Sequence, residues 1–203
     1  MKAPNFLSAP DSQEPLAQDQ RSMPRILVCT AKSKLAEDGK AKPGDVVLAD
    51  TLEPVTQPVS VVGKVHYWAV FPKYTPAGDN TPTAEFLDSP ANRARPECQW
   101  FGDEKPVAAE IIRLILWSPA TGLRALVCQR QAVRAAQAVL REIDQLQTVI
   151  YGPTFRLTAI KQGRSHVPNF DHVGFVTEEQ AKDIQSLATA IEPMLTIRTD
   201  NQK

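Results

Sequence analysis

The sequence lacks the short motifs that mark the common catalytic and nucleotide-binding sites. It contains no HExxH, GxGxxG, GxxxxGK[ST] or GxSxG pattern. Histidine is scarce, with 3 in 203 residues. An acid–base or metal site could be drawn around His166, Asp171 and His172, but structural histidines are the simpler interpretation. The residues therefore indicate no enzyme and no cofactor.

Cysteine and long apolar runs are also scarce. The 3 cysteines (Cys29, Cys98 and Cys128) form no CxxC pair, which argues against a disulfide framework and favours reduced thiols. No apolar run reaches the roughly 18–20 residues that span a bilayer. The N-terminus has no apolar segment typical of a secretory signal. We therefore expect a cytoplasmic protein with no membrane partner.

Neither sign of charge is in excess, because 23 Lys+Arg balance 23 Asp+Glu. Any anion-binding surface must come from local segregation of charge. Residues 72–106 carry six acidic and four basic side chains, whereas residues 123–175 carry three acidic and seven basic ones. Residues 145–170 contain no acidic side chain. The neutral total therefore hides an asymmetry, with a basic segment at 123–175 and an acidic one at 72–106.

The distribution of proline divides the chain. Residues 1–24 contain four prolines and few apolar side chains, which predicts a flexible arm. Residues 25–197 are expected to form a single domain, followed by a short tail at 198–203. Residues 72–106 contain six prolines and hardly any periodicity, which predicts a long loop that is either functional or mobile.

Short apolar segments separated by turn residues predict a fold that is mainly β. The first expected strand is at 25–30. Two more lie before and after a proline-containing turn, the second of them at 59–71. Four others follow at 108–117, 123–129, 151–161 and 170–176. An apolar stripe at helical spacing predicts a long helix at 130–147, and Thr177 is the expected N-cap of a C-terminal helix. No βαβ alternation is visible. We therefore predict an α+β fold, a small antiparallel barrel or sandwich with one long internal helix and a C-terminal helix.

The aromatic stretch "GKVHYWAVFPKY" begins at Gly63 and carries an aromatic ring on each face of the expected strand, because alternate side chains point to opposite faces. One face belongs to the core. The other would expose a ring flanked by Lys64 and Lys73, which suits single-stranded nucleic acid. We expect Trp68 and Tyr74 to face the ligand and Tyr67 to face the core, and a reversed pleat would exchange Tyr67 and Trp68. The alternative is a strand buried on both faces.

A basic face is expected on the long helix. Arg130, Arg134, Gln137 and Arg141 fall on the side opposite the apolar stripe. An ordinary solvated helix face would show the same pattern. Further cations, in the segment without acidic residues, are Arg156, Lys161 and Arg164.

Residues 42–176 resemble a family of bacteriophage single-stranded DNA-binding proteins with an OB-like core. The resemblance lies in "KPGDVVLADT", the aromatic strand, "CQWFG", the hairpin "EIIRLILWSPATGLRALVCQ", the helix "RQAVRAAQAVLREI" and the closing "TFRLTAIKQGRSHVPNFDHVGFV". It implies an OB-like barrel and non-catalytic, sequence-tolerant binding of single-stranded DNA in phage replication or recombination, with proteins of those processes as partners. Together with the basic face, it makes these the candidate nucleic-acid-binding residues: Lys64, Tyr67, Trp68, Lys73, Tyr74, Arg130, Arg134, Arg156, Lys161 and Arg164.

A protein-interaction module without nucleic-acid binding is the alternative function. The proline-rich arm and the acidic 72–106 segment would suit a phage-encoded inhibitor of a host enzyme or an assembly factor. The sequence leaves the oligomeric state open, a homodimer included.

Overall fold

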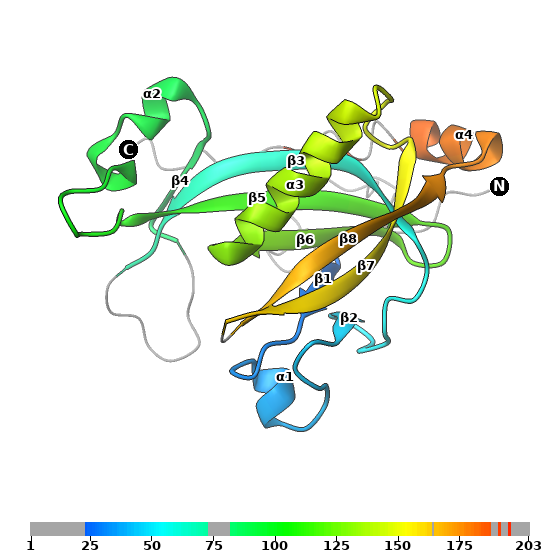
Figure 1. Ribbon diagram of the computed structural model, residues 1–203, viewed down its shortest axis with the longest axis horizontal. Coiled ribbons are helices and arrows are strands. Elements are labelled where there is room, and N and C mark those ends of the chain that lie inside the picture. The colour runs from blue at the N-terminus through cyan, green and yellow to red at the C-terminus, as the bar shows by residue number, and fades with distance from the viewer. Residues whose placement is uncertain (1–22, 73–81, 164, 188–190, 192–194, 196–203) are drawn as a thin grey trace, which may run out of the picture.

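A curled mixed sheet with two main helices makes up most of the molecule (Figure 1). The computed structural model describes residues 23–72, 82–163, 165–187, 191 and 195. The strands are β1 (Arg25–Val28), β2 (Val46–Leu48), β3 (Val59–Val70), β4 (Ala84–Leu87), β5 (Ala108–Ser118), β6 (Gly122–Gln129), β7 (Pro153–Gln162) and β8 (Ser165–Phe175). The helices are α1 (Lys34–Glu37), α2 (Pro90–Arg93), the 3-10 turn η3 (Pro96–Cys98), α3 (Gln131–Gln145) and α4 (Glu178–Ser186).

Seven strands follow one another in the order β2-β1-β6-β5-β3-β7-β8 and curl into a half-barrel, and β4 pairs with β3 beside this path. The predicted mainly β fold with a long internal helix and a C-terminal helix is confirmed. One pairing departs from the antiparallel sheet that we expected, because β1 runs parallel to β6. Parallel neighbours need a long connection. Residues 29–121 supply it, since they carry the chain through β2, β3, β4 and β5 before β6.

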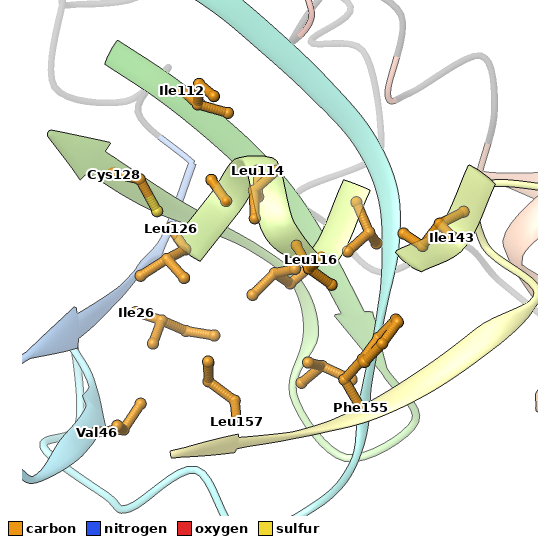
Figure 2. Close-up of a cluster of buried hydrophobic side chains, with 14 of the residues drawn as sticks. Ile26, Val46, Ile112, Leu114, Leu116, Leu126, Cys128, Ile143, Phe155 and Leu157 are labelled. Carbon is orange, nitrogen blue, oxygen red and sulfur yellow. The ribbon is translucent and has the colours of Figure 1, made fainter. Parts of the chain in front are cut away.

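Helix α3 lies across the concave side of the half-barrel (Figure 1). Val133, Ala136, Val139 and Ile143 are its buried side chains, at the three- and four-residue spacing that the apolar stripe predicts. They pack against the side chains that the strands turn inward, shown in Figure 2. We call this cluster the inner core. It comprises Ile26, Val46, Leu48, Val59, Val61, Ile112, Leu114, Leu116, Leu126, Cys128, Phe155, Leu157 and the four α3 residues.

The convex side of the sheet is covered as well. Ile115 and Trp117 of β5 pack with Ile184 of α4 and with Ile191. A second outer cluster holds Tyr67 with its neighbours on β3 and β5. Strand β5 is therefore buried on both faces, which explains why its sequence is a nearly continuous apolar run.

The segment predicted as a long loop is more structured than its composition suggested. Within its described part, 82–106, β4 pairs with the end of β3, and α2 and η3 follow. Ser89 caps α2 through its side chain and Pro90 begins it, so local capping compensates for weak periodicity. Strand β8 also starts earlier than expected. The predicted turn before it shrinks to a tight one around Gly163, where φ is 60°.

Three smaller expectations concern the ends, the thiols and the membrane. The predicted arm (apart from its last two residues) and tail lie outside the described residues. Cys29, Cys98 and Cys128 are free and buried, and burial raises the pKa of Cys128 to about 12. In the described part of the chain, no helix has the length and apolar character needed to span a membrane.

Candidate functional site

Tyr67 and Trp68 lie on opposite faces of β3, as alternation requires. Tyr67 points into the outer cluster and is only 4% exposed, and the guanidinium of Arg113 lies over its ring, 5.4 Å from the centroid. A ring with so little exposure offers no face to a base, so the structure does not support Tyr67 as a stacking residue. Trp68 is half-buried, and its indole N–H donates to Asp88 Oδ1 at 2.9 Å.

Asp88 and Glu110 hold the ring of His66 between them. His66 Nδ1 lies 3.2 Å from Asp88 Oδ2, and His66 Nε2 lies 2.8 Å from Glu110 Oε1. Glu110 Oε1 also accepts from the side-chain amide of Gln137 at 3.3 Å, which ties α3 to the sheet. We call Trp68, His66, Asp88, Arg93, Glu110 and Gln137 the carboxylate network.

Asp88 is the centre of the carboxylate network. Its carboxylate accepts from both Nε and an Nη of Arg93, from Trp68 and from His66. The hydrogen bonds from Arg93, together with Trp68 and the charge of His66, outweigh partial burial and hold the pKa of Asp88 at about 2, below its usual 3.8. The network therefore anchors the connection between β4 and α2 to the end of β3.

Two exposed aromatic rings lie further along the chain, after α2 and η3. Trp100 is 62% exposed and Phe101 is 60% exposed, although the preceding Cys98 is buried. Gly102 has a φ of 59°, which lets the chain turn back so that Phe101 pairs with Glu104. We call residues 100–104 the aromatic turn. It leads through three residues into β5, so it projects from one end of the sheet (Figure 1).

The arginines predicted on α3 are exposed. Arg134 and Arg141 lie on its outer side, and Arg130 immediately precedes the helix. Gln137, expected on the same face, instead turns toward the sheet and bonds to Glu110. Arg130 has φ 54° and ψ −120°, a conformation suited to glycine and strained for any other residue.

The remaining predicted cations lie on β3 and β7. Lys64 is exposed on the same face of β3 as Trp68, four residues away. Arg156 and Lys161 are both exposed on β7, but they are an odd number of residues apart and so point to opposite faces. The structure therefore does not bring all of the described candidate residues together on one face of the sheet. Lys73, Tyr74 and Arg164 lie outside the described residues.

Arg130 and the aromatic turn belong to the same end of the sheet. Gln129, just before Arg130, pairs with Ile111 of β5. Ile111 is four residues, or about 13 Å along a strand, beyond Val107, which immediately precedes β5 and is three residues after the aromatic turn. Within the described chain, neither Arg130 nor Arg134 has an ion-pair partner, and the same holds for Lys64, Arg156 and Lys161.

Sequence reasoning missed Trp100, Phe101 and the carboxylate network. The adjacent rings of "CQWFG", followed by a glycine and acidic residues, were the available signal for an exposed turn. No signal links Asp88 to His66, because 22 residues separate them and only the pairing of β4 with β3 brings them together.

The histidines on β8 form no common site. His172 faces the interior and packs on Phe155, whereas Asp171 faces outward and accepts from Asn169. His166 lies at the other end of β8, beside Gly44. Among the described residues, no three His, Cys, Asp or Glu side chains are arranged to hold a metal ion.

Comparison with known proteins adds no assignment: no protein-family model, no curated protein and no solved structure matches this chain.

Proposed function

We propose that this protein is a non-catalytic, OB-like single-stranded DNA-binding protein acting in phage replication or recombination, and that the aromatic turn and the arginines at the start of α3 bind the strand. The observation that carries the proposal is the order and pairing of the strands, together with the aromatic turn on one solvent-exposed connection between them. The resemblance of residues 42–176 to phage proteins of this class is consistent with that strand order.

The pairing of β3, β5, β6 and β7 is that of a Greek key. The first three are consecutive antiparallel neighbours apart from the short β4, and β7 returns through α3 to pair with β3. The spatial order β7-β3-β5-β6 therefore matches the 4-1-2-3 order of that motif. Strand β8 pairs with β7 as a fifth strand, and β1 lies near β8 on the far side. A five-stranded, partly open Greek-key barrel is the OB architecture.

OB-like barrels bind oligonucleotides with the loop between strands one and two, among other surfaces. The aromatic turn lies on the corresponding connection, between β3 and β5. Exposed rings at this place suit base stacking, which tolerates any sequence because every base has a flat face. The carboxylate network supports this function by fixing the part of this connection between β4 and α2 to the barrel.

The arginines supply the phosphate contacts in this proposal. Arg130 and Arg134 are exposed and unpaired within the described chain. Arg130 also keeps a charged side chain in a backbone conformation that favours glycine, and such strain is concentrated at functional sites. The acidic pair Asp103 and Glu104 repels phosphate, so the turn contributes stacking while the charge comes from α3.

Anisotropy titration of a labelled dT30 oligonucleotide tests the function directly. We expect binding at low salt that weakens as salt is raised, because bound cations release counterions. Replacing both Trp100 and Phe101 by alanine should weaken binding at least about 5-fold, the lower value for one lost base stack. Val149→Ala, a matched exposed apolar change, should not weaken it.

Two charge variants refine this test. Arg130→Ala with Arg134→Ala should weaken binding and reduce the salt slope, whereas the exposed control Arg25→Ala should do neither. Absence of dT30 binding by the wild-type protein at low salt would rule out the proposed function.

A protein-interaction module is the second candidate, and one observation favours it. Trp100, Phe101 and Val107 expose apolar surface beside Asp103 and Glu104, a combination that would fit a partner with a basic-rimmed apolar pocket. Asp103→Asn with Glu104→Gln separates the two candidates. If DNA is the ligand, the double variant should bind dT30 more tightly than the wild type does. If the protein is an interaction module, neither the wild type nor the double variant should bind dT30.

A further inference from the structure

A pocket of about 520 Å³ opens on the convex side of the sheet, at the opposite end of β5 from the aromatic turn. Its floor is one row of side chains across three strands. Ser60 of β3 pairs with Trp117 of β5 on one side and with Thr154 of β7 on the other. Paired residues point to the same face. Thr154 in turn pairs with Gly174 of β8, so small residues beside a large Trp leave the hollow.

The floor contains a buried hydroxyl group without a partner. Ser60 is 1% exposed, and its Oγ makes no hydrogen bond within the described chain. A buried polar atom of this kind is costly unless a ligand or water satisfies it. Gln180 lines the rim, and its Oε1 already accepts from the backbone N–H of Thr177 at 3.0 Å. Its amide N–H groups have no acceptor within the described chain and are left to donate to a ligand.

The walls are flat and uncharged. Pro58 and Pro119 lie on the rim, and none of the lining residues is ionisable. Phe175 is 58% exposed but is held in place from the core. His172 packs edge-on against Phe175, with ring centroids 5.1 Å apart, and lies 5.7 Å from the buried ring of Phe155. The His172 ring is fixed in turn by a 2.8 Å hydrogen bond to the carbonyl of Gly174.

A free cation lies next to this uncharged pocket. Arg156 is two residues beyond Thr154 on β7, so it points to the same face about 7 Å along the strand. It is exposed and forms no ion pair within the described chain. Its cross-strand neighbour Asp171 accepts from Asn169 at 2.9 Å instead.

We infer that this pocket is a subsite for one nucleotide of single-stranded DNA. The base stacks on Phe175 and hydrogen-bonds with its edge to Ser60 and Gln180, and the phosphate lies at Arg156. A neutral planar ligand with donors and acceptors on its edge and one adjacent negative charge fits each of these features. The inference rests on the proposed function and places a second contact region on the face opposite α3.

The test compares dT30 with an oligonucleotide of the same length in which abasic spacers replace the bases. Phe175→Ala should weaken dT30 binding about 5-fold or more and leave the abasic strand unaffected, because only the base stacks on the ring. Arg156→Ala should weaken both and lower the salt slope by about 0.7 for one lost phosphate contact. Val173→Ala, which removes an exposed apolar side chain from β8 outside the pocket, is the matched control.

The outcomes distinguish this inference from the proposed function. Wild-type binding of dT30 that Phe175→Ala and Ser60→Val leave unchanged would overturn the subsite and leave the function standing. No wild-type binding to either strand would overturn both. Circular dichroism of each variant shows that the fold is retained, and Phe175 and Arg156 are exposed enough for their removal to be tolerated.

Discussion

On the concave face of the sheet, the two ends of β3 contact different kinds of side chain: apolar ones near its start and charged ones near its end. Near its start, Val59 and Val61 point into the inner core and meet α3 and Phe155. Near its end, His66 and Trp68 point the same way but enter the carboxylate network. Val62 makes the switch possible. It is the extra residue of a bulge between Val61 and Gly63, which moves the inward positions from odd to even numbers.

This difference separates what folds the barrel from what positions the aromatic turn. Apolar contacts are non-directional and scale with buried area, so the inner core stabilises the whole half-barrel. Hydrogen bonds to a charged carboxylate are directional, so the network orients one connection. Substitutions in the inner core should therefore lower the free energy of unfolding more, and affect more of the sheet, than substitutions in the carboxylate network.

The largest effect on stability is expected from Phe155→Ala. Phe155 is fully buried in the inner core, and its removal leaves a cavity between β7 and α3 (Figure 2). The free energy of unfolding should fall by about 3–5 kcal/mol. Urea denaturation measures this loss, and protection against hydrogen exchange should fall throughout the sheet. A loss below about 1 kcal/mol would contradict the packing of the inner core.

A smaller and more local loss is expected from Asp88→Asn. The amide keeps the shape but removes the charge that Arg93 and His66 contact. Unfolding should become about 2 kcal/mol easier, a typical cost for lost hydrogen bonds to a charged group. Hydrogen exchange should accelerate in β4 and α2 before it does so in β6. Asp183→Asn, an exposed carboxylate on α4, is the matched control. Uniform acceleration across the sheet would contradict a local role.

The same carboxylate predicts a pH dependence. The folded-state pKa of Asp88 is about 2, below the 3.8 of an unfolded chain. A depressed pKa contributes stability above pH 3.8 that is lost as the pH falls toward 2. Comparing wild type with Asp88→Asn between pH 5 and pH 2 isolates this contribution, at most about 2 kcal/mol. The difference between the two proteins should shrink as acid is added. A difference that grows would reverse the assigned sign.

Arg130→Gly is expected to act in the opposite direction on stability. Glycine relieves the strain at φ 54° and ψ −120° but adds freedom to the unfolded chain, so a net gain of about 1 kcal/mol is expected. If Arg130 contacts DNA, the same variant should bind dT30 more weakly. Arg130→Ala is the control, since it removes the charge and keeps the strain. Equal stability of the two variants would contradict strain at this position.

The parts of the fold that the sequence predicted are those in which local pattern and burial agree. Helix α3 shows its apolar stripe, and the β5–β6 hairpin has Gly122 at positive φ in its turn. The parallel pairing of β1 with β6 was not predicted, because no local signal records which distant strand becomes a neighbour. Strand β4 was not predicted, because the prolines around it interrupt the periodic pattern. In the candidate site, the exposure of the α3 arginines was foreseen, whereas the carboxylate network was not, because Asp88 meets His66 and Trp68 only through the pairing of β4 with β3.

Trp100→Ala should change stability least of all, and for that reason it separates binding from folding most sharply. The ring is 62% exposed and packs in none of the three core clusters, so the free energy of unfolding should stay within about 0.5 kcal/mol of wild type. A ring exposed to this degree offers its flat face to a base, so its removal should still weaken dT30 binding about 5-fold. Asp88→Asn in the same assay tests whether anchoring matters, because it frees the connection while Trp100 remains. If Asp88→Asn leaves dT30 binding intact while Trp100→Ala weakens it, the ring binds without help from the carboxylate network.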